Sequence, residues 1–138
     1  MTSMRIIKFQ DPVARAISYI RPFIPAGGAI GLDVPPNWDW KNLLVTVTDT
    51  GGRGERDVVL DDARLTFVVY HPNSVTASDS ALNLHGLIRA WPENERGVRF
   101  LRTMTRPNFS PDDASHTPGY LFTCELSFRA AHFDLTTI

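Results

Sequence analysis

The sequence predicts an α+β fold: two helices packed on one face of a mostly antiparallel or mixed sheet of four to five strands. Two segments, residues 57–70 and 119–131, alternate apolar side chains with other residues, which is the period of a strand. Between them, apolar residues recur at helical spacing after residue 74. The expected order, α-β-β-β-α-β-β, groups strands together with only two helices, which favours helices layered on a sheet. All 138 residues fit a single domain.

Composition limits the classes of protein. Hydrophobic residues make up 43% and charged residues 21%, which is typical of a folded globular chain rather than a disordered one. The net charge of −1 disfavours a dedicated nucleic-acid binder. There are 12 arginines and only two lysines, a bias that suits interface ion pairs and that a GC-rich source genome would equally produce.

Cysteine usage and hydropathy set the expected compartment. Cys124 is the only cysteine, so neither an internal disulfide nor a thiolate zinc site can form. The first residues lack the apolar region of a signal peptide, and no apolar run approaches the roughly 18–20 residues of a membrane span. We therefore expect no membrane contact, and synthesis and folding in a reducing cytoplasm.

The first half of the chain begins with a short helix over residues 12–21. Asp11 is a favourable N-cap, and Pro12 suits the first helical position. Residues 29–34 contain glycine and lie between prolines, which indicates an edge strand. Residues 43–49 form the next predicted strand, and the glycine-rich segment 51–56 turns the chain back as a hairpin.

The centre of the chain is a strand over residues 57–70 that runs into a helix. We expect this helix to begin near Ser74 and to end before Pro92. Its apolar stripe is narrow enough to cover one sheet face and comprises Ala77, Ala81, Leu84, Ile88 and Trp91. Leu82 lies off this stripe, which hints at a second packing surface.

The last part of the chain contains two more strands. Residues 98–104 form the first, and a proline-rich loop over 106–118 follows it. Residues 119–131 show the cleanest alternation, with one face predicted to be buried and the other, including Glu125 and Arg129, to be wet. Residues 1–10 and 132–138 are expected to be loose ends.

No catalytic constellation stands out. Cys124 lies on the apolar face of its strand, where a thiol without a basic neighbour is inert. The four histidines lack metal-binding spacing. Neither Asp61–Asp62 nor Asp112–Asp113 suits a catalytic pair, because adjacent strand residues point to opposite faces and the second pair reads as turn chemistry. We therefore expect no enzyme activity, no catalytic residue, no metal site and no cofactor.

Several short sequence patterns occur along the chain in an order that resembles that of a known family. They are Asp33-Val34-Pro35, Thr50-Gly51-Gly52, the run from Asp57 to Thr66, Ile88-Arg89-Ala90, Pro111-Asp112-Asp113, and the run from Pro118 to Thr123. Over roughly residues 11–130, this order resembles the tail terminator (tail completion) proteins of long-tailed bacteriophages of actinobacteria. Two features depart from the usual pattern: the aromatic loop 37–42, and Gly119 where an arginine commonly precedes the tyrosine.

The resemblance implies a structural virion protein at the head-proximal end of the tail. Such proteins form a ring, typically a hexamer, that caps the major tail tube protein, stops tube polymerisation and joins the head–tail connector. DNA would pass through the lumen without sequence recognition. A neck protein of head–tail completion is the alternative within the same class. A small-molecule binding module is the alternative from another class, and it would require polar groups converging on a buried face.

A ring requires two different, matching surfaces on each subunit, because its contacts are heterologous. We expect these surfaces, and the contact with the tube, in the polar loops 51–56 and 106–118 and at exposed apolar positions. The candidate interface residues are Trp38, Trp40, Arg53, Glu55, Arg56, Leu82, Arg106, Asp112 and Asp113.

Overall fold

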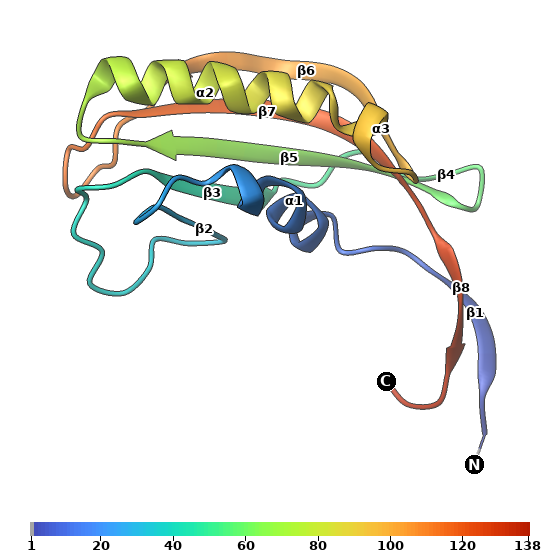
Figure 1. Cartoon of the computed structure of the whole chain (residues 1–138). Helices are drawn as coiled ribbons and strands as arrows, with labels where there is room; N and C mark the ends of the chain where they lie inside the picture. The colour runs from blue at the N-terminus through green and yellow to red at the C-terminus, as the bar shows by residue number, and fades with distance from the viewer. Residues whose placement is uncertain (1) are drawn as a thin grey trace.

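The computed structural model describes residues 2–138 and has an α+β fold with a mixed sheet of many strands and a few helices (Figure 1). In chain order the elements are β1 (Met4–Lys8), α1 (Pro12–Ile20), the 3-10 turn η1 (Arg21–Phe23), β2 (Ala29–Gly31), β3 (Leu44–Asp49), β4 (Gly54–Arg56), β5 (Leu60–Tyr70), α2 (Ser74–Arg89), α3 (Trp91–Asn94), β6 (Val98–Phe109), β7 (Gly119–Arg129) and β8 (Ala131–Leu135).

The main sheet has the strand order β2-β3-β5-β7-β6, and β4 pairs with β5 beside this path. All pairings in it are antiparallel except β2 with β3, which are parallel. The sheet therefore has six strands among the described residues, where the sequence predicted four to five. The additional strand is β4, which lies inside the segment 51–56 that we expected to be only a turn.

The core lies between the sheet and the helices α1 and α2. Ala63, Leu65, Phe67 and Val69 of β5 point into it, as their alternation predicted. Tyr19 of α1 stacks on Trp91 with ring centroids 4.8 Å apart, and its hydroxyl donates to the carbonyl of Leu87 at 2.8 Å. These contacts join α1 to α2 and α3, and Trp91 in turn packs edge-on against Phe128 of β7.

Several predicted boundaries were wrong, each for a local reason. The strand expected from Asp57 begins at Leu60, because Asp57 and Val58 adopt positive φ angles of 52° and 69° in a turn. The long helix, in contrast, begins at Ser74 and stops at Arg89, before Pro92 as predicted, and Pro92 lies in the first turn of the short helix α3, where a missing N–H is tolerated. The loop expected from Arg106 begins after Phe109, because β6 continues to that residue.

Most of the β7 face that was predicted to be wet is buried, although Arg129 at its end is exposed as predicted. Thr123, Glu125 and Ser127 are 8%, 2% and 1% exposed, although they point away from the helices. Long arginine side chains from β6 and from the β3–β5 connection gather over this face. Alternation correctly separated the two faces of β7, but it did not predict that charged side chains would cover the second one.

Within the two terminal segments that were expected to be loose ends, residues 4–8 and 131–135 are paired. β1 and β8 pair as an antiparallel two-stranded ribbon over five residues each, with Met4 opposite Leu135 and Lys8 opposite Ala131. Figure 1 shows this ribbon running away from the sheet, with the start of β1 and the end of β8 on the side away from the sheet.

Candidate interaction surfaces

The terminal ribbon has one strongly apolar face. Directly opposite residues of an antiparallel pair lie on the same face. Met4 with Leu135 and Ile6 with Phe133 therefore share one face, which Lys8 borders with its ammonium 4.4 Å from the Phe133 ring centroid. The other face carries Arg5, Ile7, His132 and Asp134.

Nothing in the described chain covers that apolar face. No residue of β1 or β8 belongs to the core cluster, and Met4 and Phe133 are 60% and 42% exposed. A lone two-stranded ribbon is at best marginally stable in water unless something packs against it. The apolar face of the ribbon is therefore a candidate docking surface.

A second surface lies on the side of the sheet that faces away from the helices, and we call it the arginine hollow. Its rim is formed by Arg53, Arg56, Arg99 and Arg102, with Leu101, and its floor by the buried carboxylates of Asp62 and Glu125.

At the floor of the arginine hollow, Arg56 donates to Asp62 through Nε and Nη2 at 2.9 and 3.2 Å. This bidentate bond lowers the pKa of Asp62 below its ordinary value, and a hydrogen bond with Ser127 acts in the same direction. The same bond raises the pKa of Arg56. Asp62 is therefore well satisfied.

Glu125 is satisfied less well. Its nearest cationic groups are Arg53 at 3.8 Å and Arg64 at 3.9 Å, both beyond hydrogen-bond distance. Its Oε2 atom is buried and has no hydrogen-bond partner among residues 2–138. Arg99 and Arg102 are exposed and form no ion pair with any described residue.

The opposite end of the sheet is acidic. The loop between β2 and β3 brings Asp33 and Asp39, and the loop between β6 and β7 brings Asp112 and Asp113. Both loops lie at the same end of β5 (Figure 1). None of the four carboxylates forms an ion pair within the described chain, although Lys41 and Arg106 lie nearby in sequence. We call this surface the acidic end.

Tyr70 joins the two loops of the acidic end. Trp40 of the first loop packs edge-on against Tyr70 with ring centroids 5.5 Å apart. Burial raises the pKa of Tyr70, and the carboxylates of Asp112 and Asp113 in the second loop raise it further. Asp112 accepts hydrogen bonds from the backbone N–H and the hydroxyl of Ser115, both at 2.8 Å, which lower its pKa and fix the turn.

The two tryptophans proposed as interface residues serve the fold as well. Trp38 and Trp40 are half-buried, and Trp40 covers Tyr70. The indole N–H of Trp38 is buried without a partner among the described residues.

Leu82 belongs to an exposed apolar patch. It is 52% exposed on the outer side of α2 and, with Val75 at 79%, borders a shallow hollow that Tyr120 also lines. Phe109, 57% exposed, packs edge-on against Tyr120, with ring centroids 5.5 Å apart. Leu82, Val75, Phe109 and Tyr120 thus form one surface, which we call the Leu82 patch.

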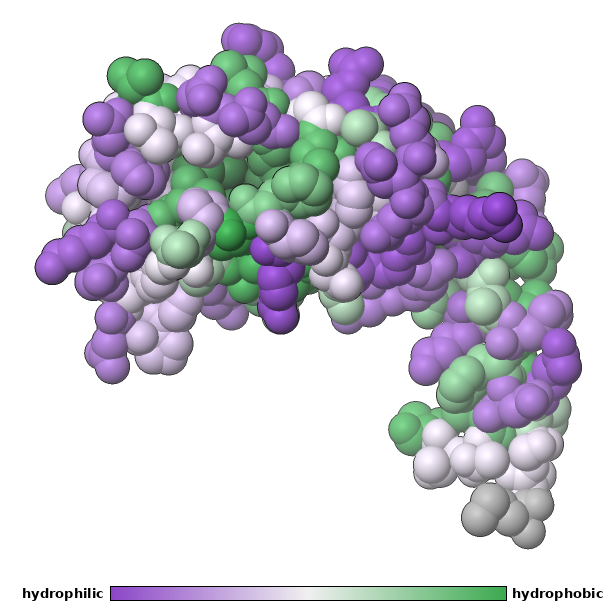
Figure 2. All heavy atoms as spheres, viewed as in Figure 1, coloured by the Kyte–Doolittle hydropathy of each residue, from purple (hydrophilic) through white to green (hydrophobic). Residues whose placement is uncertain are grey.

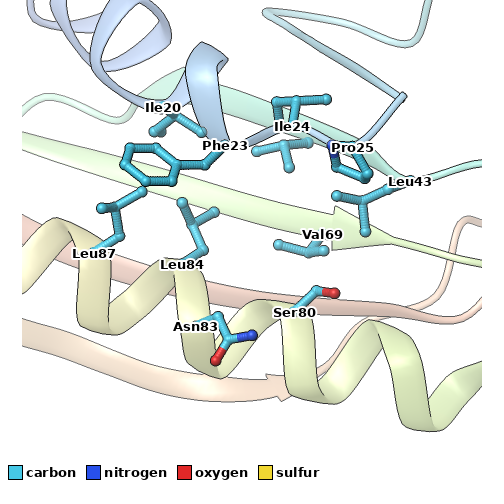
Figure 3. A pocket seen from close by; sticks show the side chains of 11 residues that line it. Ile20, Phe23, Ile24, Pro25, Leu43, Val69, Ser80, Asn83, Leu84 and Leu87 are labelled. Carbon is cyan, nitrogen blue, oxygen red and sulfur yellow. The ribbon is translucent and has the colours of Figure 1, made fainter. Parts of the chain in front are cut away.

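An apolar cleft of about 330 Å³ opens between the helices (Figure 3). Figure 2 shows it as a hollow with hydrophobic side chains in the middle of this face. Its walls come from α1, η1, β3, β5 and α2, and only Ser80 and Asn83 bring polar groups. Its lining residues are Ile20, Phe23, Ile24, Pro25, Leu43, Val45, Val69, Ser80, Asn83, Leu84 and Leu87.

Residues that could do chemistry are dispersed. Within residues 2–138, no group of three or more His, Cys, Asp or Glu side chains is arranged to hold a metal ion. His85 bonds the Thr103 hydroxyl at 2.7 Å, and burial lowers its pKa. Burial raises the pKa of the Cys124 thiol to about 11, so it is a thiol at neutral pH. None of the helices in the described chain is long and apolar enough to cross a membrane.

The structure brings together some of the sequence-predicted interface residues and separates others. Arg53 and Arg56 meet in the arginine hollow, whereas Glu55 pairs opposite Asp61 and points to the other face. The acidic end, at the other end of the sheet from the arginine hollow, contains Asp112, Asp113, Trp38 and Trp40. Exposed Arg106 is on β6 near that end. Leu82 is exposed, as its off-stripe position indicated.

Arg99, Arg102 and the ribbon were missed. Arg99 and Arg102 are three apart, so a regular strand would place them on opposite faces; a bulge between Phe100 and Arg102 puts both in the hollow. The ribbon had a readable signal, the alternation Met4, Ile6, Lys8 and Ala131, Phe133, Leu135.

Comparison with known proteins adds no identification. No protein-family model matches the chain, and no curated protein matches it either.

Proposed function

We propose that this chain is a structural subunit of a phage tail, a tail terminator that forms a ring, most simply a hexamer, on the end of the tail tube. The ring stops tube polymerisation, offers the surface that joins the head–tail connector, and lets DNA pass without sequence recognition. In this proposal the protein belongs to the virion, at the head-proximal end of the tail, and has no catalytic role.

The observation that carries the proposal is the terminal ribbon. Its apolar face, with Met4 60% and Phe133 42% exposed, is presented by a ribbon that touches no core. Burying apolar area stabilises by about 25 cal/mol per Å², so an uncovered face of this kind favours a subunit whose structure is completed by other proteins. The order of short sequence patterns supports a tail terminator among such subunits.

Tube capping is the direct test. Purified phage tail tube protein is polymerised alone and with the purified chain, and tube lengths are measured by electron microscopy. We expect the chain to shorten the tubes and to appear as a ring on one end. Sedimentation of the chain alone provides the second readout. Unchanged tubes, together with a monomer at every concentration, would remove the proposal.

The ribbon supplies a matched pair of variants for this assay. The double substitution Met4→Ser and Phe133→Ser changes the apolar face, and Ile7→Ser changes an apolar residue, 39% exposed, on the opposite face. We expect the double variant to lose capping while Ile7→Ser retains it. Equal loss in both variants would indicate general instability of the ribbon instead of a docking face.

Two alternatives give different results. A neck protein of head–tail completion would bind a connector and leave tube length unchanged. A small-molecule binding module is favoured by the apolar cleft, whose volume of about 330 Å³ lies at the lower end of ligand pockets. However, Ser80 and Asn83, its only polar groups, both come from α2 and do not converge from different walls. Thermal-shift screening with apolar small molecules tests that alternative.

A further inference from the structure

The arginine hollow carries more positive charge than its own carboxylates balance. Four arginines line it above two carboxylates. Arg56 is committed to Asp62 by a bidentate bond, and Arg53 lies 3.8 Å from Glu125. Arg99 and Arg102 are exposed at the rim and pair with no described residue. Two guanidinium groups are thus available to an acidic ligand, for which their forked geometry is suited.

The floor of the hollow is also incomplete. Glu125 is only 2% exposed, yet its Oε2 atom has no donor among residues 2–138. A buried carboxylate oxygen without a hydrogen bond is costly. The nearest cationic groups to this carboxylate, Arg53 and Arg64, lie 3.8 and 3.9 Å away. A group that fills the hollow should therefore bring acceptors for Arg99 and Arg102 together with a cationic donor on the Glu125 side.

The acidic end has these two properties. Asp33 and Asp113 are exposed there and pair with no described residue. Lys41 is exposed in the same loop as Asp33 and supplies N–H donors. A nucleic-acid phosphodiester would bring acceptors but no donor, and it would approach the Glu125 and Asp62 carboxylates, so a protein surface of mixed charge fits better.

One chain cannot satisfy itself in this way. Arg64, opposite Glu125, and Tyr70, opposite Gly119, are six residues apart on β5. At about 3.3 Å per residue, the hollow and the acidic end are about 20 Å apart along one rigid sheet. The acidic end that enters a hollow must come from another molecule.

We propose that the arginine hollow of one copy receives the acidic end of the next copy, with Asp33 and Asp113 opposite Arg99 and Arg102 and Lys41 directed at Glu125. Because the two surfaces differ, the contact is head-to-tail and repeats around a ring. This inference rests on the proposed function and specifies which surfaces join neighbouring subunits.

Charge reversal with complementary mixing is the test. The hollow variant carries Arg99→Glu and Arg102→Glu, and the end variant carries Asp33→Lys and Asp113→Lys. Each variant alone repels its own copies, and we expect its dissociation constant for self-association to rise about tenfold or more. In an equimolar mixture the reversed hollow of one variant can meet the reversed end of the other, and the unchanged end can meet the unchanged hollow, so alternating assemblies should re-form. Native mass spectrometry counts the two chains in each assembly.

Controls separate this inference from the proposed function. Arg21→Glu with Arg96→Glu changes the same net charge at exposed positions outside the hollow and should leave assembly unchanged. Circular dichroism confirms folding of every variant. A wild-type chain that stays monomeric at every concentration and also leaves tube length unchanged contradicts the proposed function itself. A wild type that assembles while the hollow variant assembles equally well contradicts only this contact, as does a mixture that fails to recover.

If the hollow variant retains assembly and instead loses binding to duplex DNA, the occupant is a phosphate backbone, and the copy-to-copy contact is wrong. The salt dependence of wild-type assembly adds an independent check. Ion pairs at a rim are screened, so association should weaken as salt rises. Assembly that strengthens with salt would point to an apolar contact instead.

Discussion

Leu→Ala substitutions at Leu82 and Leu84 distinguish effects on folding stability from effects on assembly, because the same change is made on two faces of one helix. Leu84 is 7% exposed and packs in the core cluster, whereas Leu82 is 52% exposed on the outer side of α2. Leu→Ala at a buried site costs about 2–5 kcal/mol. Leu84 also lines the apolar cleft, where neighbours can relax into the space, so we expect the lower part of that range.

Leu82→Ala should change the free energy of unfolding by less than about 0.5 kcal/mol, as is usual for a surface position. Helix propensity does not confuse the comparison, since both substitutions exchange leucine for alanine inside α2. Urea unfolding at low protein concentration measures both values, and an unchanged m-value shows that the unfolded states are comparable.

The two variants should rank in the opposite order in the tube-capping assay, where the more stable variant is expected to be the less active one. Leu82→Ala is expected to cap tubes poorly despite its stability, because it removes the centre of the Leu82 patch. Leu84→Ala should cap normally at temperatures where it is folded. A Leu82→Ala variant that is both stable and fully active would refute the patch as a contact surface. A cost at Leu82 equal to that at Leu84 would refute the assigned faces of α2.

Three further predictions concern the fold. Arg56 lowers the pKa of Asp62, so the stability that this pair adds is present above the ordinary carboxyl pKa of about 3.9 and is lost as pH falls through the folded value. Asp62→Asn should therefore cost stability at neutral pH and nothing in strong acid. Urea unfolding at a series of pH values measures this difference. Gly52→Ala should destabilise strongly in thermal unfolding, because φ is +116° and a Cβ would clash with the Asp62 carbonyl oxygen. Gly51→Ala, with open space around it but also a positive φ, should cost less stability. Cys124 should resist thiol reagents in the native protein at mildly alkaline pH and react on unfolding, since burial raises its pKa to about 11.

The fold was predictable where one period dominates a segment. The alternation in β5 and β7 and the apolar stripe that starts on α2 together identify the majority of the core residues correctly, because burial on one face imposes that period. The predicted boundaries of strands were wrong where the local backbone geometry departs from the periodic pattern. Positive φ at Asp57 and Val58 delays β5, and no periodic pattern contains that information.

The candidate surfaces were predictable only in part. Loop position was enough to suggest Arg53, Arg56, Asp112 and Asp113, because polar loops lie at sheet ends. Their separation into a basic and an acidic surface depends on strand register, which the sequence alone does not provide. Arg99 was hidden for a different reason, since a bulge in β6 brings it beside Arg102 on one face.

The number of uncovered surfaces bears on how such a subunit could work. A ring subunit between a tube and a connector needs two surfaces for its ring neighbours and one for each axial partner. The arginine hollow and the acidic end are complementary in charge and lie along one strand direction, which suits them to neighbours in the ring. The terminal ribbon and the Leu82 patch are apolar and remain for the axial partners. On this assignment Leu82→Ala should leave the ring intact and remove only an axial contact, so its rings should be visible free of tubes. If this variant instead forms no rings, the Leu82 patch belongs to the contact between ring subunits, and one axial partner has no assigned surface.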